Sequence, residues 1–285
     1  GRKNTIQPLK SICSMKTRRF NILVLLLAVF FCACNTSPGK NNSAEAKEES
    51  PSVTIAKLQQ AVVAKPDSAG LRYLLMDELL KDSRFKEALT QNDTLLSIDS
   101  SNAGVWYRRG AIFLQSGDTV SSITAFKKAV ESAPMFAEPL LQLSAVYANQ
   151  LKPEALAIAD RIINLAEEPR VASQARFIKG LYYSNMNDKA KAIEQFDECI
   201  KNDYTFLEAY IEKGLLLFDQ QNYAEALKVF ERAIQVSNTF AEAYYQAGRC
   251  QEALGDNAEA KLNYQKTLGL DKNFTAAREA LEKLK

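Results

Sequence analysis

Apolar side chains follow two different patterns along the 285-residue chain. Ten of them run consecutively from Ile22 to Phe31, whereas from residue 52 onward they are interspersed with polar residues. In this second region they recur at the three- and four-residue spacings that place side chains on one face of an α-helix. The pattern predicts a succession of amphipathic helices, and no segment shows the alternation typical of a β-strand.

The helical region repeats itself with a fixed period. Gly180, Gly214 and Gly248 lie 34 residues apart in similar surroundings, and Gly110 lies two periods plus two residues before Gly180. A fixed period of this length indicates a solenoid, in which each unit stacks on its neighbours to bury its apolar face.

One further helix is expected at each end of the repeated region. The stretch SVTIAKLQQAVVAKP, residues 52–66, predicts one helix of a half-repeat. The stretch TAAREALEKLK, residues 275–285, predicts a terminal helix that carries its apolar side chains on one stripe: Ala276, Ala280, Leu281 and Leu284. Because a stacked array needs a polar outer end, this last helix is expected to act as a cap.

The 34-residue unit resembles the tetratricopeptide repeat. Residues 103–136 carry the family's characteristic positions at Trp106, Gly110, Phe113, Gly117, Phe126, Ala129 and Pro134. Further copies are expected at residues 69–102, 137–172, 173–206, 207–240 and 241–274, of which 137–172 loses one residue near Pro153 and gains three near Pro169. The resemblance implies an all-α, right-handed superhelical solenoid of antiparallel helix pairs over residues 52–285. It would comprise six repeats and the capping helix.

The resemblance also implies how the two helices of a repeat pack. Glycine at the eighth position of the first helix lets the second helix approach closely, where a small residue such as Ala192, Ala226 or Ala260 meets it. The aromatic residues of the second helix are expected to fill the space toward the next repeat.

The apolar run near the N-terminus predicts a targeting signal. It follows Lys16, Arg18 and Arg19, is too short to span a bilayer, and ends at Ala33-Cys34. This arrangement resembles a bacterial lipoprotein signal, which implies cleavage after residue 33 and a covalent lipid on Cys34. An ordinary signal peptide or an uncleaved anchor are the alternatives. Residues 34–51 would then form the lipidated cysteine and a flexible linker, and we expect a bacterial envelope location, with the outer membrane favoured over the inner.

Composition and charge narrow the function further. The chain has no histidine, which excludes histidine-based catalysis and histidine metal ligands. Without the first 33 residues, 30 basic residues face 34 acidic ones, so a nucleic-acid partner is not expected. The five cysteines are too scattered for a disulfide framework, and no nucleotide, metal or nucleophile motif is present. We expect no cofactor, no metal and no enzymatic activity.

The resemblance assigns the candidate binding residues to a concave groove lined by the first helices. These residues are Tyr73, Asp77, Tyr107, Leu141, Phe177, Leu181, Glu208, Ile211, Phe218, Asp219, Glu242, Tyr245 and Arg249. The groove is expected to be apolar in the middle and acidic toward the C-terminal half, which suits a partner segment with basic and apolar residues. The alternative is that several of these side chains pack between neighbouring first helices. The basic clamp that some family members use for a carboxylate is absent.

The stretch WYRRGAIF illustrates the two alternatives. Trp106 next to Arg108 and Arg109 is compatible with nucleic-acid stacking, but its spacing from Gly110 recurs at Tyr210/Gly214 and Tyr244/Gly248. Trp106 is therefore predicted to be a packing residue, with both arginines pointing away from it and Tyr107 facing a partner.

Together these features predict a membrane-tethered adaptor that binds another protein or peptide in its groove. A ligand- or glycan-binding lipoprotein of an uptake system is the alternative. A third hypothesis, an enzyme that uses converging groove carboxylates, requires two acids held about 5–10 Å apart.

Overall fold

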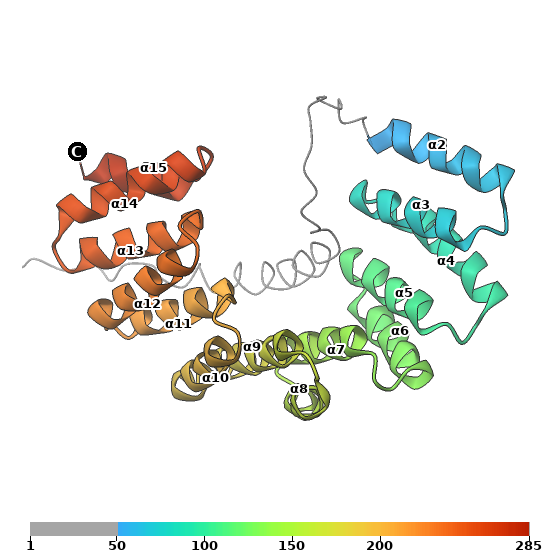
Figure 1. Ribbon diagram of the computed structural model, residues 1–285, viewed down its shortest axis with the longest axis horizontal. Coiled ribbons are helices and arrows are strands. Elements are labelled where there is room, and N and C mark those ends of the chain that lie inside the picture. The colour runs from blue at the N-terminus through green and yellow to red at the C-terminus, as the bar shows by residue number, and fades with distance from the viewer. Residues whose placement is uncertain (1–50, 285) are drawn as a thin grey trace, which may run out of the picture. The chain divides into compact units, whose positions relative to one another are not determined.

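The computed structural model describes residues 51–284, and every regular element in that range is an α-helix (Figure 1). The predicted signal, Cys34 and its linker up to residue 50 lie outside the described residues. No described helix combines the length and the apolar character needed to cross a membrane. The helices are α2 (Pro51–Ala64), α3 (Ala69–Lys81), α4 (Phe85–Ile98), α5 (Ala103–Gln115), α6 (Thr119–Ser132), α7 (Ala137–Asn149), α8 (Glu154–Leu165), α9 (Pro169–Asn185), α10 (Lys189–Asn202), α11 (Leu207–Asp219), α12 (Tyr223–Val236), α13 (Ala241–Ala253), α14 (Asn257–Leu270) and α15 (Thr275–Lys283).

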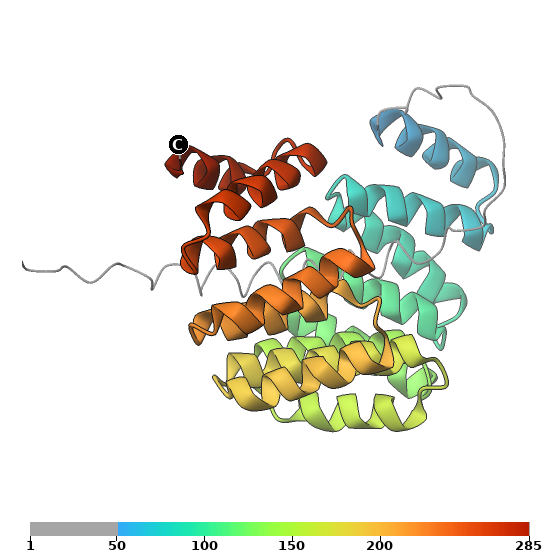
Figure 2. The ribbon, with the colours of Figure 1, turned by 60° about the vertical axis from the view of Figure 1, so that its left-hand side comes forward.

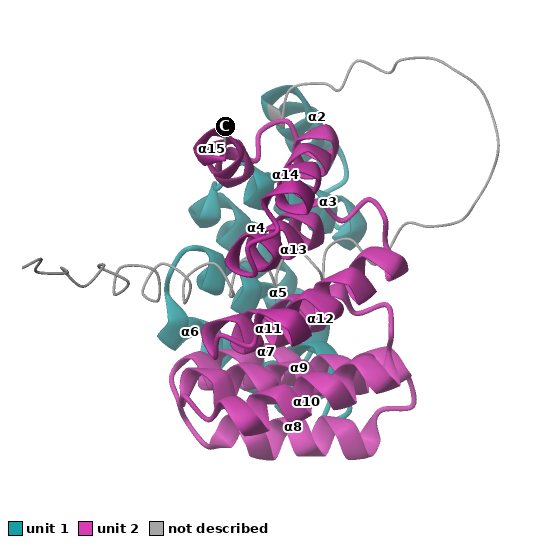
Figure 3. Cartoon of the chain, turned by 90° about the vertical axis from the view of Figure 1, so that its left-hand side faces the viewer, with its two compact units in different colours: residues 1–139 teal, residues 140–285 magenta. Residues whose placement is uncertain are grey.

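The chain forms two compact units, residues 1–139 and 140–285, which are described separately (Figure 3). Unit 1 contains α2 and the pairs α3/α4 and α5/α6. Unit 2 contains the pairs α9/α10, α11/α12 and α13/α14, and ends with α15. The partners of each pair run antiparallel and pack together, as Figures 1 and 2 show. The predicted all-α fold of stacked helix pairs is therefore confirmed, and the handedness of the superhelix stays a prediction.

Each helix pair turns through one residue in the left-handed region. Counting the first residue of each expected repeat as position 1, this residue stands at position 15 in all six repeats. It is glycine in two of them, Gly117 and Gly255, where φ is 87° and 86°. The other four are Ser83, Leu151, Asn187 and Gln221, with φ between 57° and 62°. Because left-handed backbone is unfavourable for residues with a Cβ, its recurrence at one position shows that the first helices of all six expected repeats end in the same way.

The glycine at position 8 lies directly beneath an aromatic ring of the second helix. A Cβ built on Gly110, Gly180 or Gly214 would come within 2.4 Å of the ring at position 24, which is Phe126, Phe196 or Phe230. On Gly248 it would come within 2.7 Å of Tyr264. All four rings are fully buried. The aromatic residue thus packs over the glycine of its own repeat, and is not confined to filling the gap toward the next one.

Two repeats lack this glycine and also lack the aromatic ring. Ser144 takes the place of glycine in the repeat at 137–172, and the equivalent residue of α8 is Ala159. Met76 takes that place in the repeat at 69–102, and the equivalent residue of α4 is Asn92. All four side chains are buried. A larger residue on the first helix is thus matched by a smaller one on the second, as close packing requires.

The irregular repeat at 137–172 places its changed residues at two points. Three residues lie between the left-handed Leu151 and the buried Ala155, whereas four lie between Ser83 and its counterpart Ala88. Because the connection between α7 and α8 is not shortened, the missing residue is lost at the start of α8, which has 12 residues where α4 has 14. The three added residues extend the start of α9, which has 17 residues where most other first helices have 13. Proline at the first position of α9 suits this longer start because its missing N–H has no helical partner there.

Each unit is organised around its own apolar core. In unit 1, Ile55 and Val62 of α2 pack with Leu75, Leu79 and other side chains of α3 to α5. In unit 2, the rings of Tyr210 and Phe230 pack with small residues of α11 to α13, among them Ala233 and Ala247. The terminal helix α15 buries Ala277 against α14 and presents charged residues outward, as expected of a cap.

Candidate functional site

Aromatic residues at position 5 of the first helices pack into three-ring clusters. Three such clusters recur, each built from positions 5, 24 and 34 of one repeat: Tyr107/Phe126/Phe136, Phe177/Phe196/Phe206 and Tyr245/Tyr264/Phe274. Their ring centroids lie 4.9–5.9 Å apart, the range of favourable aromatic contact. Burial raises the pKa of the Tyr107 phenol to about 12, with a contribution from Glu138. Tyr107 is half-buried and packs against the rings of Phe126 and Phe136, and its contact with a partner stays a prediction.

Four of the predicted groove residues are buried within the fold. Leu141, Phe177, Leu181 and Ile211 each expose at most 8% of their surface. A partner could contact them only after local rearrangement. For these four side chains the structure supports the packing alternative, because positions 5 and 9 contribute to the contacts between successive repeats.

In unit 1 the predicted residues Tyr73 and Asp77 both contact one arginine, Arg108. Arg108 of α5 places its guanidinium 4.9 Å from the ring centroid of Tyr73 and forms an ion pair with Asp77, both on α3. The positive charge of Arg108 is thus matched by the carboxylate of Asp77. Tyr73 and Asp77 do lie together, but they serve this contact between two first helices.

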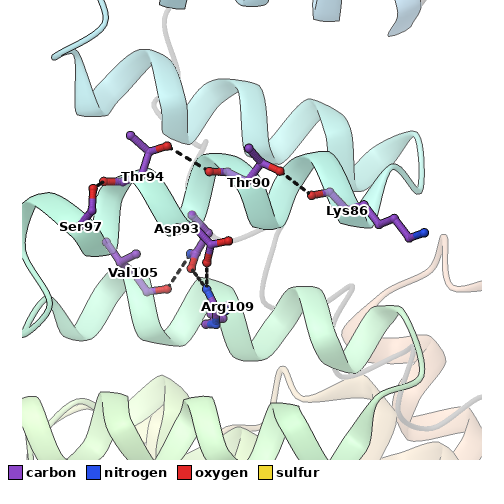
Figure 4. A network of polar contacts seen from close by, with 8 residues as sticks. Lys86, Thr90, Asp93, Thr94, Ser97, Val105 and Arg109 are labelled. Carbon is purple, nitrogen blue, oxygen red and sulfur yellow. Dashed lines mark hydrogen bonds and ion pairs between the residues drawn. The ribbon is translucent and has the colours of Figure 1, made fainter.

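Trp106 and Arg109 belong to a junction between repeats, of which Figure 4 shows the contact between Arg109 and Asp93. The Trp106 indole N–H donates to the carbonyl oxygen of Ser100 at 2.8 Å, in the turn before α5. Arg109 lies 5.9 Å from the Trp106 ring centroid and forms an ion pair with Asp93 of α4. Trp106 is a packing residue as predicted, whereas the expectation that Arg109 points away from it is wrong.

The same junction recurs in unit 2. Tyr210 and Tyr244, at the position of Trp106, donate their hydroxyl hydrogens to the carbonyl oxygens of Tyr204 and Asn238, six residues earlier in each case. At the position of Arg109, Lys179 pairs with Asp160 and Lys213 pairs with Asp197. An aromatic residue with a polar group at position 4, a cation at position 7, or both therefore join consecutive repeats: both occur on α5 and α11, the cation alone on α9 and the aromatic residue alone on α13.

Six of the predicted residues that are not buried lie on α11 and α13 in unit 2. We call this set the α11–α13 face, and it consists of Glu208, Phe218, Asp219, Glu242, Tyr245 and Arg249. Asp219 is exposed and the other five are half-buried. α11 and α13 are in contact with each other, so these side chains share one surface.

Arg249 is the centre of this face. Its guanidinium carbon lies 4.4 Å from the ring centroid of Phe218 on α11 and 6.0 Å from that of Tyr245. Its Nη1 donates to Oε1 of Gln246 at 2.8 Å, and Gln246 in turn donates to the carboxylate of Glu242. Stacking and hydrogen bonding together restrain the arginine side chain.

Several carboxylates act on Tyr245, which lies one helical turn before this arginine. Burial raises the pKa of Tyr245, Arg249 opposes that shift, and Glu242, Glu252 and Glu279 add to it. Glu252 also accepts a hydrogen bond of 2.7 Å from the buried hydroxyl of Tyr264. The α11–α13 face therefore combines one cation, Arg249, with carboxylates, and the predicted acidic groove stays a prediction.

Sequence reasoning omitted Gln246 and Glu279 from the candidate site. Gln246 stands at position 6 of its repeat, and none of the predicted groove residues occupies that position. It nevertheless orients Arg249, because it accepts a hydrogen bond from the guanidinium. Glu279 stands at position 5 of the incomplete seventh unit, on the capping helix α15. Extending the repeat register through α15 would have found it.

The two thiols in the described chain are inert. Cys199 and Cys250 are free and fully buried, and burial is the main cause that raises both pKa values, that of Cys250 to about 12. Within residues 51–284 no three cysteine, aspartate or glutamate side chains converge as a metal site would require. Neither observation points to chemistry at these positions.

Family models identify the repeat. Models described as "Tetratricopeptide repeat" match residues 73–134, and residues 173–206 and 241–274, and one described as "TPR repeat" matches residues 214–255. The chain contains tetratricopeptide repeats. None of these models covers residues 137–172, where the left-handed residue at position 15 recurs as Leu151.

Several solved structures share the fold. A tetratricopeptide repeat protein from Parabacteroides merdae ATCC 43184 is 17% identical with a TM-score of 0.61, over 94% of this chain and 99% of that chain. PilW, a widely conserved type IV pilus biogenesis factor, is 16% identical with a TM-score of 0.61, over 74% and 97%. Pseudomonas aeruginosa pilF is 16% identical with a TM-score of 0.55, over 82% and 100%. Comparison with curated proteins found no significant match. At these identities the similarities establish the fold alone.

Proposed function

We propose that this protein is a non-enzymatic, membrane-tethered adaptor of the bacterial cell envelope, which binds a segment of another protein on the α11–α13 face. The partner segment carries basic and apolar residues. Cys34 bears the lipid that holds the protein to the membrane, with the outer membrane favoured.

The observation that supports binding at this face is its combination of partly exposed aromatic and acidic side chains. Phe218 and Tyr245 retain accessible ring surface, while Glu208, Asp219 and Glu242 have no basic partner in the ion pairs of residues 51–284. Aromatic surface beside unneutralised carboxylates favours a ligand with apolar and cationic side chains. In unit 1, by contrast, Asp77 is already neutralised by Arg108.

The aromatic clusters weaken the alternative of a glycan-binding lipoprotein. Such a protein would present open aromatic platforms, but Tyr107 and Phe177 each pack against two further rings. No observation favours the hypothesis of converging catalytic carboxylates, because Glu242 and Glu252 are each engaged by a neutral donor.

Site-specific photocrosslinking in native membranes tests the proposal. A photoreactive residue at the exposed position Asp219 is expected to give a discrete protein adduct, whereas one at Glu231, exposed on the second helix α12, is expected to give none. Charge reversal at Glu208 and Glu242 should abolish the adduct, while reversal at Glu194 and Glu259, on the second helices α10 and α14, should preserve it. Equal labelling from positions 219 and 231 would contradict a partner at this face.

A further inference from the structure

Arg249 differs in one respect from Arg108 and from the cations at the junctions between repeats. Arg108, Arg109, Lys179 and Lys213 each form an ion pair with an aspartate of a neighbouring helix. No ion pair joins Arg249 to a carboxylate anywhere in residues 51–284, although its guanidinium is half-buried. Partial burial of an unneutralised guanidinium is unfavourable unless another group compensates its charge.

Arg249 is nevertheless held in place without an anion. The ring of Phe218 supports its guanidinium, and Gln246, which exposes only 5% of its surface, accepts one of its N–H groups. Gln246 is fixed in turn by Glu242. An arginine restrained in this way keeps N–H donors at the edge of its plane, in the fork that matches the two oxygens of a carboxylate.

The charges around Arg249 restrict what can bring that carboxylate. Glu242, Glu252 and Glu279 all act on Tyr245, one helical turn before Arg249, so an anionic segment would be repelled in this region. A single carboxylate with basic neighbours would satisfy Arg249 and the surrounding acids at once.

We infer that Arg249 binds an aspartate or glutamate side chain within the partner segment, flanked on both sides by lysine or arginine. This inference rests on the proposed function, because it specifies the segment that the α11–α13 face recognises. Arg249 selects the central acidic residue, and the surrounding carboxylates select its basic neighbours.

Selection from a random display library tests the inference without a known partner. Twelve-residue peptides are selected on the immobilised full chain, and separately on the Arg249→Gln variant. The wild-type chain is expected to enrich peptides with an acidic residue between basic ones, and Arg249→Gln to enrich basic, apolar peptides without the acidic preference. Enrichment of basic peptides that lack a central acid on the wild-type chain would overturn the inference and leave the proposed function intact. If no peptide is enriched on either protein, both fail.

A binding cycle then measures the contact directly. Replacing the acidic residue of the best peptide by its amide should weaken binding to the wild-type chain about tenfold, and should leave binding to Arg249→Gln unchanged. Arg249→Lys, which keeps the charge but loses the fork, should retain part of the preference, and Phe218→Leu should reduce it. Arg108→Gln is the matched control, because Arg108 also lies over an aromatic ring but is paired with Asp77. An equal tenfold loss in the wild-type chain and in Arg249→Gln would overturn the assignment.

Discussion

The residue at position 8 and the residue at position 24 of a repeat are matched in size. Glycine faces an aromatic ring in four repeats, serine is combined with alanine in one, and Met76 is combined with Asn92 in another. The pairing follows from packing, because the two helices approach at this point and the available volume is shared between two side chains. The two positions should therefore be energetically coupled.

A double-mutant cycle at Gly110 and Phe126 measures that coupling. Gly110→Ser is expected to cost about 1–3 kcal/mol of unfolding free energy by overpacking, and Phe126→Ala about 3–5 kcal/mol by leaving a cavity. The double variant, which reproduces the Ser144/Ala159 pair, should lose at least about 1 kcal/mol less than the sum of the two. Chemical denaturation of the three variants checks this, and strict additivity would contradict the size matching.

Gly269 supplies the control for the glycine argument. It lies within α14, and a Cβ there would meet nothing within 4 Å. Gly269→Ala should therefore stabilise the protein by up to about 1 kcal/mol, the helix preference for alanine.

The left-handed residue of each turn gives a second prediction at this scale. Leu151 adopts φ 57° and is partly exposed, so its side chain contributes little packing to offset the backbone cost. Leu151→Gly is expected to raise the unfolding free energy by about 0.5–1 kcal/mol, while Gly117→Ala, at the equivalent turn, should lower it by about 1 kcal/mol. Thermal melts of both variants check the opposite signs.

At the scale of the helix, the longer start of α9 is held by a side chain of α10. Asn202 donates from its amide nitrogen to the carbonyl oxygen of Pro169 at 2.6 Å and to the hydroxyl of Ser173 at 2.9 Å. The Ser173 hydroxyl in turn donates a hydrogen bond of 3.4 Å to the carbonyl oxygen of Cys199. In other repeats the residue at position 4, which is Trp106, Tyr210 or Tyr244, makes a polar contact with the preceding turn. α9 carries Arg176 at that position, and the network of Asn202 takes the place of this contact.

Asn202→Ala should therefore loosen the start of α9. Loss of both hydrogen bonds is expected to lower the unfolding free energy by about 1–2 kcal/mol and to increase amide hydrogen exchange at residues 169–173. Lys201→Ala is the control, because its ion pair with Glu198 is largely exposed and should contribute less than about 0.5 kcal/mol. Unchanged exchange at the start of α9 would contradict the role of Asn202.

Particular helices show what the sequence could and could not predict. α3, α5, α11 and α13 begin at residues 69, 103, 207 and 241, where the expected repeats begin, because their glycines and aromatics report a periodic local environment. The exposed fraction of Tyr107 could not be predicted from this local pattern. It depends on Phe126 and Phe136, which lie 19 and 29 residues further along the chain. The ion pair of Arg108 with Asp77 likewise joins different repeats.

At the scale of the whole molecule, the prediction that matters most concerns Cys34. If Cys34 carries a lipid, Cys34→Ser removes the acyl chains that attach the protein to the membrane. The variant should then appear in the aqueous phase of a detergent partition and in the soluble fraction of a lysate. Cys32→Ser is the matched control and should leave partitioning unchanged. Continued membrane association of Cys34→Ser would contradict the lipid anchor.

The two buried thiols make unit 2 its own reporter of local opening. Cys199 belongs to α10 and Cys250 to α13, so they stand in different repeats. Their raised pKa values mean that at pH 8 neither is a thiolate while its repeat is closed, and an alkylating reagent can react only during transient opening. Mass spectrometry of each alkylated peptide should give two rates. Because a stacked array opens from its ends, Cys250, nearer the C-terminal cap, is expected to react faster.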